Sequence, residues 1–460
     1  MKSRSDAPSL IPAERRAAFS LAAIYALRML GLFLILPVFA LYAEKLPDHT
    51  PLLVGLAVGI YGLTQAVLQI PFGLLSDRIG RKPVIVGGML VFALGSVVAA
   101  GAETIQGVIL GRALQGSGAV AAAVMALAAD LSREEVRTRV MATIGISIGG
   151  AFILSLVLGP MLYHWIGVPG IFWLTAGLAL AGVLVTLFLV PQPAHSSVHR
   201  DAEPVPAQFR AVLRNIDLMR LNFGVFTLHM MLTALFLVVP LGLRDLGLAS
   251  ASHWQVYLPV MLVSMGAMVP FIILAEKRRH MKGVLMGAVA TLAVAEAGLY
   301  LLGGGMAGVV VSLLLFFTAF NLLEASLPSL VAKMAPVTGK GTAMGFFTSS
   351  QFLGAFVGGV LGGWAHQLAG SQAVFLLGAG AALLWFLVAL GMSNPRYFSS
   401  QLLKVGPLED EEARQLGSRL RDVPGVAEAE VVAGDGVAYL KVDKEKLDQA
   451  ALSRFAAAQA

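Results

Sequence analysis

The chain has no cysteine and little charge. None of its 460 residues is a cysteine, and only 13% are Asp, Glu, Lys or Arg. The lack of thiols excludes disulfides, zinc–thiolate sites, iron–sulfur clusters and a cysteine nucleophile. A soluble domain has about 25% charged residues, whereas this chain is 57% hydrophobic with a mean hydropathy of +0.79. The composition is that of an integral membrane protein.

Signatures of several function classes are also missing. The sequence has no phosphate-binding glycine loop, no nucleophile–histidine pair and no metal-ligand cluster. We therefore expect neither an enzyme nor direct drive by ATP, and we expect no cofactor and no metal. The net charge of +6 comes from short connections between apolar segments, so nucleic acid is not an expected partner. Residues 1–14 show no signal-peptide cleavage pattern.

Long apolar runs dominate the chain. A helix needs about 20 apolar residues to cross a bilayer. The sequence therefore predicts an all-α membrane protein with twelve transmembrane helices, at about 17–43, 52–75, 83–101, 105–130, 139–162, 168–190, 217–243, 253–275, 284–302, 306–332, 341–365 and 372–392. A short N-terminal segment (1–16) precedes them. A proline-rich linker (191–216) separates an N-terminal six-helix half (17–190) from a C-terminal one (217–392).

The two halves resemble each other, which is typical of parallel-repeat transporters. Phe72–Val84 aligns with Phe271–Val284, each a charged connection between the second and third spans of its half. Lys and Arg gather in the N-terminal segment and the even-numbered connections, whereas the opposite connections hold only Lys45 and Arg244. By the positive-inside rule, both termini of this multi-pass protein are cytoplasmic, and we expect a bacterial inner membrane.

A different composition begins after the last span. Residues 396–460 hold no long apolar run and predict a small soluble domain. We expect strands at Gln401–Val405, Val426–Val432 and Val437–Val442 and helices at Glu409–Arg421 and Asp443–Ala457. This βαββα order fits a ferredoxin-like plait. The sequence from Leu420 to Glu428 is similar to heavy-metal-associated domains, but the paired cysteines that bind metal there are lacking, so we expect no metal in this domain. Its ligand or partner is left open.

The most informative motif is Gly73-Leu-Leu-Ser-Asp-Arg-Ile-Gly-Arg-Lys-Pro83. Its charges mark a membrane surface, and Gly80 can take the positive φ of a helix-ending turn. The spelling resembles the signature of the major facilitator superfamily. In that family these charges join an acid at the end of the fourth span in a latch beside the eleventh span, here near Gly341. The resemblance assigns the latch to Gly73, Asp77, Arg78, Gly80, Arg81, Lys82, Asp130 and Arg137. Solvated surface charges are the alternative.

Polar residues inside spans indicate a transport pathway, because they are costly in lipid. Tyr61, Gln65 and Gln69 form one stripe, and Arg112 stands in a Gly-Arg-Ala-Leu-Gln sequence that resembles the fourth-span motif associated with proton coupling. Glu324 is the best candidate for a titrating carboxylate, with Arg28 or Arg112 expected across the cavity. The predicted proton and substrate pathway is Arg28, Gln65, Gln69, Arg112, Gln115, Asn321 and Glu324. Structural packing is the alternative role for each. His229, Asn222, Gln351 and His366 are weaker candidates.

The overall pattern resembles the drug:proton antiporter branch of the family. Gly159-Pro160 matches part of the antiporter motif, although Tyr163-His164 replace the glycines expected next. The resemblance implies proton-coupled export of a small drug-like compound or metabolite by alternating access, with protons and the lipid bilayer as partners and a monomer as the expected state. A sugar or metabolite facilitator or importer of the same fold is one alternative, and a membrane sensor that uses the C-terminal domain is another.

Overall fold

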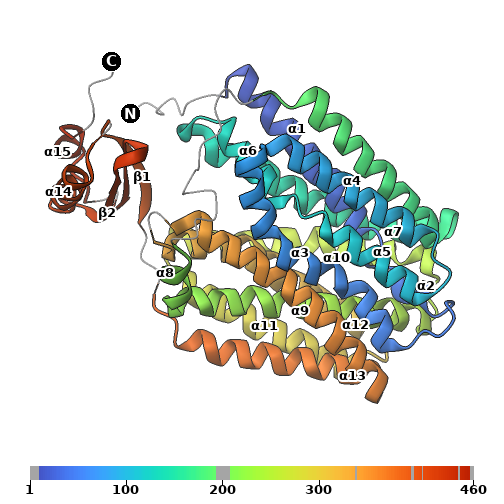
Figure 1. Ribbon diagram of the computed structural model, residues 1–460. Helices are drawn as coiled ribbons and strands as arrows, with labels where there is room; N and C mark the ends of the chain where they lie inside the picture. The colour runs from blue at the N-terminus through green and yellow to red at the C-terminus, as the bar shows by residue number, and fades with distance from the viewer. Residues whose placement is uncertain are drawn as a thin grey trace.

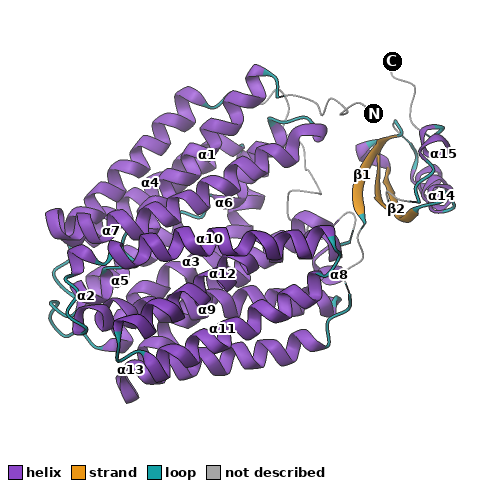
Figure 2. Cartoon of the chain, turned by 180° about the vertical axis from the view of Figure 1, so that it is seen from behind, coloured by secondary structure: helices purple, strands orange, loops and turns teal. Residues whose placement is uncertain are grey.

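The computed structural model describes residues 10–192, 208–336, 339–394, 398–406, 408–443 and 446–455. The predicted N-terminal segment and linker lie partly outside them. The chain forms a helical bundle with a small α/β domain, here called the tail (398–455), beside one end (Figure 1). Helix α1 begins at the same end, which we call the tail end. The opposite, far end carries α2 and the start of α3 (Figures 1 and 2).

The bundle is built from long apolar helices. Among the described residues, ten helical segments are long and apolar enough to cross a membrane. The N-half (10–192) contains α1 Pro12–Phe33, α2 Phe39–Ala43, α3 Pro51–Ile79, α4 Arg81–Ala100, α5 Ile105–Ser117, α6 Ala121–Asp130, α7 Glu134–Leu184 and the π-helical turn Val185–Leu189. The C-half (208–394) contains α8 Phe209–Arg214, α9 Ile216–Asp245, the 3₁₀ turn Ser250–Ser252, α10 Trp254–Lys277, α11 Met281–Leu302, α12 Met306–Met334 and α13 Lys340–Leu390.

Two of these helices reverse direction at a glycine. Helix α7 is non-helical at Gly167 (φ 66°), and α13 is non-helical at Ala369 and Gly370 (φ 75°). Arg133, just before α7, bonds to Glu14, and Leu189, just after it, bonds to Arg16, so both ends lie beside the start of α1. A positive φ is readily reached only by glycine, which lets the chain turn without a longer loop.

The observed boundaries correct several expectations. Helix α3 continues to Ile79, so Asp77 and Arg78 are helical and only Gly80 (φ 95°) separates α3 from α4. One glycine suffices because its positive φ turns the backbone sharply within a single residue, so no loop is needed. The predicted first and fourth spans are each broken, at 34–38 and at 118–120. Part of the predicted linker is helical: in α8, Phe209 packs edge-on to Phe346 at 5.2 Å.

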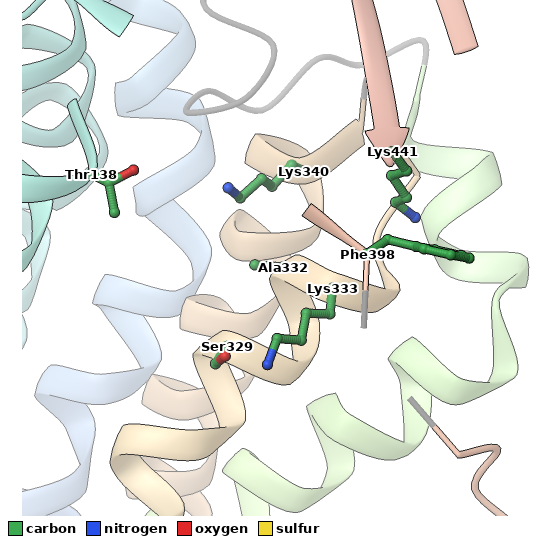
Figure 3. Close-up of a pocket in the computed structure, with 7 residues that line it drawn as sticks. All are labelled: Thr138, Ser329, Ala332, Lys333, Lys340, Phe398 and Lys441. Carbon is green, nitrogen blue, oxygen red and sulfur yellow. The ribbon is translucent and has the colours of Figure 1, made fainter. Parts of the chain in front are cut away.

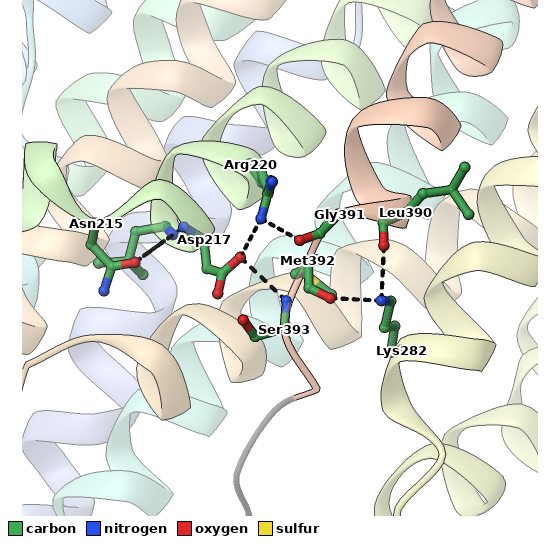
Figure 4. A network of polar contacts seen from close by, with 9 residues as sticks. Asn215, Asp217, Arg220, Lys282, Leu390, Gly391, Met392 and Ser393 are labelled. Carbon is green, nitrogen blue, oxygen red and sulfur yellow. Dashed lines mark hydrogen bonds and ion pairs between the residues drawn. The ribbon is translucent and has the colours of Figure 1, made fainter.

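Each half closes its last helix in the same way. In the N-half, the Lys82 ammonium donates to the Val190 carbonyl at 2.6 Å. In the C-half, the Lys282 ammonium donates to the carbonyls of Leu390 at 2.9 Å and Met392 at 2.6 Å. Arg220 adds a bond to the Gly391 carbonyl while pairing with Asp217 at 2.9 Å (Figure 4). Cations suit helix C-termini because the last carbonyls have no partner within the helix.

The tail is a three-stranded antiparallel sheet with a helix on it. The strands β1 Ser399–Lys404, β2 Val426–Val432 and β3 Val437–Val442 lie in the order β1-β3-β2. This places β3 inside a split βαβ unit whose helix is α14 Asp410–Arg421. The predicted last helix is shorter than expected: α15 spans Gln449–Ser453, because Asp448 caps it through the Ala451 amide at 2.9 Å. Residues 456–460 lie outside the described part.

We predict that the bundle and the tail fold independently. The tail has its own core around Leu420, Leu440 and Leu452. Removal of all residues after Asn394 is expected to leave a membrane-inserted bundle that elutes as a single symmetric peak in detergent. The isolated segment 396–460 is expected to melt cooperatively by circular dichroism. Loss of membrane insertion in the truncated chain would contradict this prediction, as would a structureless isolated tail.

Candidate transport site

A buried polar network in the N-half is centred on Arg28. One of its Nη atoms donates to the Tyr61 hydroxyl and to the Gln65 carbonyl oxygen, each at 2.6 Å. Gln65 in turn donates to Gln69 at 3.2 Å. Arg28, Gln65 and Gln69 are almost fully buried. The residues of α3 recur one turn apart, so the stripe predicted from the sequence does face α1.

A second network surrounds Arg112 on α5. Its guanidinium donates to Gln115 at 2.8 Å and to the carbonyls of Ala57 and Val58 at 3.4 and 3.3 Å. The two networks meet at Tyr61, whose ring centre lies 5.1 Å from the Arg112 guanidinium and 5.9 Å from that of Arg28. No carboxylate among the described residues pairs with either arginine. Two positive charges inside the bundle are therefore held by neutral groups and a ring.

The C-half holds a separate network around Glu324 on α12. The Gln351 amide on α13 donates to Glu324 Oε1 at 3.3 Å and lies 2.8 Å from Nε2 of His229 on α9. His229 Nε2 is 3.7 Å from Glu324 Oε2, and the other ring nitrogen, Nδ1, is 3.2 Å from the Val225 carbonyl. The partner of Glu324 is therefore an imidazole of its own half. The expected arginine across the cavity is not its partner, because the guanidiniums of Arg28 and Arg112 are engaged around Tyr61.

Two further polar residues of the C-half lie apart from Glu324. Asn321, one turn earlier on α12, donates to the Ser264 hydroxyl of α10 at 3.0 Å. Glu296 on α11 is only 2% exposed and faces Gly378, where a Cβ would lie 2.6 Å from its carboxyl carbon. Asn321 therefore bonds to α10 and not to Glu324, and Glu296 sits between α11 and α13.

The halves touch closely near the far end. A Cβ built on Gly55 of α3 would lie 2.0 Å from the carbonyl oxygen of Gly359 on α13, and one on Gly363 would lie 2.4 Å from that of Pro51. Such distances leave no room for side chains, so the two backbones are in direct contact. Glu44, after α2, pairs with Arg244 at the end of α9 across the same end. Farther in, Phe352 of α13 packs on Tyr61 at 6.1 Å between ring centres.

The antiporter-like motif lies against the break in the first span. A Cβ on Gly159 would be 2.6 Å from the Leu34 carbonyl oxygen and 2.8 Å from Pro37 Cγ. Pro160 continues the helix within α7. The following Tyr163 and His164 line a far-end cavity of about 490 Å³ together with Tyr42 and Lys45, whose ammonium lies 5.5 Å from the Tyr163 ring centre.

The predicted latch residues divide into a connected core and outliers. Arg81 bonds to Asp77, to Asp130 at 3.2 Å and to the Ser76 hydroxyl at 2.8 Å. Gly73 packs on Ala122, where a Cβ would lie 3.0 Å away. Gly80 forms the turn, Arg78 is exposed, Arg137 is buried on α7, and Lys82 bonds to Val190.

Among the described residues, Asp77 of the latch core bonds within the N-half in this conformation. Arg81 is the hydrogen-bonding partner that Asp77 has among the described residues. No hydrogen bond joins Asp77 to the described start of α13 near Gly341, beside which the latch charges are expected. At the tail end, a cavity of about 290 Å³ opens between the halves and the tail. It is lined by Thr138, Ser329, Ala332, Lys333, Lys340, Phe398 and Lys441 (Figure 3).

A bundle of apolar helices with buried charges in each half and closure near one end defines a membrane transporter. The sequence profile of the Major Facilitator Superfamily matches residues 21–359. The chain is 47% identical to the inner membrane transport protein YajR of Escherichia coli K12, over 95% of this chain and 96% of that protein. It therefore belongs to the Major Facilitator Superfamily and is a multi-pass inner membrane protein. The resemblance of the sequence to the major facilitator superfamily is thereby confirmed.

More distant relatives share the fold. The multidrug resistance protein MdtH of Aeromonas salmonicida is 26% identical over 78% of this chain and 90% of its own length. The crystal structure of a bacterial homologue of the human lysosomal transporter Spinster matches with a TM-score of 0.67 at 12% identity, covering 84% of this chain and 98% of that one. This chain is accordingly a transporter with a small-molecule substrate, not an enzyme.

We predict that Gly359→Leu blocks closure of the far end, because its side chain would overlap the backbone of α3. Gly380→Leu on the same helix is the control, since a Cβ there meets nothing within 4 Å. Spin labels on cysteines introduced at His49 and Gln372 are expected to move apart by several ångströms in Gly359→Leu only. Equal distances in both variants would refute the assignment.

Proposed function

We propose that the protein is a proton-coupled secondary transporter that exports a small drug-like compound or metabolite by alternating access, acting as a monomer. The observation that carries this proposal is that the N-half holds a cationic network and the C-half holds an acidic one. A coupled transporter needs a group that binds a proton and a site that changes sides. Similarity to MdtH, a multidrug resistance protein, favours export.

The two reversals support twelve membrane crossings. Helix α7 and helix α13 each have 51 residues, which is about 75 Å at 1.5 Å per residue, far beyond the hydrocarbon thickness of about 30 Å. Counting each as two spans turns the ten candidate segments into twelve. The charge asymmetry of the connections supports a cytoplasmic tail end, with both termini and the tail on that side.

The conformation corresponds to an inward-facing state. The backbones of α3 and α13 meet toward the far, extracytoplasmic end, and Glu44 pairs with Arg244 there. At the cytoplasmic end a cavity separates Thr138 of the N-half from Ser329 of the C-half. We propose that Asp77, which pairs here with Arg81 of its own half, docks on the start of α13 when the cytoplasmic end closes.

Glu324 is the proposed coupling carboxylate. It lies on a membrane helix, its side chain is 40% exposed, and it is bonded to neutral Gln351. A group in such a place can hold a proton in one state and release it in the other. Arg28, Gln65, Gln69, Arg112, Gln115 and Asn321 are proposed to line the substrate pathway around it, with Gly159 and Pro160 supporting the movement of the first span.

We predict that Glu324→Gln abolishes transport driven by a pH gradient but preserves substrate exchange, because the amide mimics the protonated carboxyl. A substrate from a thermal-stabilisation screen in detergent would serve in both proteoliposome assays. Glu296→Gln is the matched control, since its carboxyl is buried between α11 and α13, away from Glu324. Retained gradient-driven transport in Glu324→Gln would exclude this residue as the proton carrier.

We predict that Asp77→Asn impairs transport while the protein stays folded. Arg81 keeps its pair with Asp130 when Asp77 is replaced, so its charge stays compensated and the fold should persist. The variant and Arg81→Ala are expected to shift the population toward the inward-facing state. Cytoplasmic accessibility of a cysteine introduced at Ser329 would report that shift. Wild-type accessibility and transport in both variants would contradict the latch.

A further inference from the structure

We propose that His229, Gln351 and Glu324 form one proton-binding unit, and that Gln351 transmits its state to the contact between the halves. The inference rests on the proposed proton coupling and extends it. It gives a function to two residues, His229 and Gln351, and to the hydrogen bonds that join three helices, α9, α12 and α13.

The hydrogen bonds fix the state of the imidazole in this conformation. An amide nitrogen donates and cannot accept, so the 2.8 Å contact from Gln351 makes His229 Nε2 the acceptor. The ring proton then sits on Nδ1 and donates to the Val225 carbonyl at 3.2 Å. His229 is therefore neutral, and the second amide hydrogen of Gln351 goes to Glu324 Oε1 at 3.3 Å. Every donor of the unit is satisfied.

The unit has one acceptor left for an added proton. Glu324 Oε2 is buried, has no hydrogen-bond donor among the described residues and lies 3.7 Å from His229 Nε2. When a proton from water binds Nε2, the new N–H donates to Oε2 and closes this gap as a charge-assisted bond. Gln351 can no longer donate to Nε2. Its side chain must either turn its carbonyl oxygen toward the new N–H or move away from the ring. The same proton leaves to water when the bond opens in the other state.

The groups that contact this unit are otherwise neutral. The His229 ring touches Val225 on its own helix, Phe320 and Glu324 on α12, and Gln351 on α13. Among these described contacts Glu324 is the one charged group. Nearer the tail end of α12, Lys333 is paired with Glu276 of α10 at 2.8 Å. The charge of the unit is thus set by the proton that His229 and Glu324 share.

Gln351 is a positioning residue because of its neighbour in the chain. Phe352 packs on Tyr61, the ring between Arg28 and Arg112, and a Cβ on Gly62 would lie 2.4 Å from the Phe352 carbonyl oxygen. On the same helix, Gly359 forms the backbone contact with α3. A helix is stiff over two turns, so a change at Gln351 moves the surface that holds the N-half. Protonation in one half is thereby felt at the interface.

The test separates proton binding from the conformational response. The chain has no cysteine, so Thr138→Cys and Ser329→Cys can carry spin labels at the cytoplasmic mouth without other changes. Their distance is measured in nanodiscs across the range of about pH 5 to 8 in which histidine changes charge. In parallel, NMR of labelled histidine follows ring protonation, and His229→Gln identifies the signal among the eight histidines.

In the wild type we expect the His229 signal to titrate and the distance to change with it. Gln351→Leu is expected to keep the titration and lose the distance change. Thr348→Val is the control, because the Thr348 hydroxyl bonds only to Met344 of its own helix among the described residues; both responses should persist. Gln351→Met repeats the test if the leucine variant is unstable. His229→Gln should lose both responses.

Two results would overturn the proposal: a His229 signal that does not titrate in this range, or a Gln351→Leu distance change as large as that of the wild type. Failure of the proposed function looks different. In that case titration and distance change would follow the expected pattern, but a pH gradient would drive no transport in proteoliposomes.

Discussion

The direct backbone contact between α3 and α13 is the interaction on which the arrangement of the two halves depends. Glycines on both helices allow an approach that any side chain would prevent. A Cβ on Gly55 would lie only 2.0 Å from the Gly359 carbonyl oxygen. This approach also places Phe352 against Tyr61. A contact of backbone with backbone carries no charge and few side-chain rotamers, so it can form and separate repeatedly at little entropic cost. That property suits the alternating access proposed for this protein.

The polar groups of the bundle follow from the cost of charge in lipid. Arg28 and Arg112 are buried, and they are held by a phenol, amides and carbonyls. Hydrogen bonds to neutral groups keep a guanidinium charged while leaving it ready for an anionic partner. The N-half thus concentrates positive charge around Tyr61, whereas the C-half concentrates its acid at Glu324. The two networks differ in sign and are linked through one helix, α13.

Much of the architecture could be predicted because membrane helices can be recognised in a sequence by their length and hydropathy. The charged turn at Gly80, the repeated halves and the strands of the tail were all readable from local sequence. The breaks near Pro37 and Gly118 were not, since an apolar run looks the same whether its helix is continuous or interrupted. The extent of α3 was also missed, because charged residues can remain helical at a membrane surface.

The site was predictable in its members more than in its pairing. Arg28, Gln65 and Gln69 do meet, since the spacing on one helix is visible in the sequence. The partner of Glu324 was assigned wrongly, because it comes from helices about one hundred residues earlier and about thirty later, and spacing says nothing across such distances. A lone histidine at position 229 gave a weak signal. The clue available in the sequence was Gln351, a polar residue near the same depth of its own span.

The lysine at the start of α11 has a consequence for the reach of the tail. Lys282 and Arg220 pin the carbonyls of Leu390, Gly391 and Met392, so the chain leaves the bundle from a fixed point. From Asn394 to Phe398 the chain has four residue steps, which extend to about 14 Å at most. The tail is therefore joined to the C-half by a short connection. In the alternating access proposed for this protein, the tail must therefore move with the C-half. Its local concentration at the mouth of the tail end is then set by the length of this connection, not by the amount of protein in the cell.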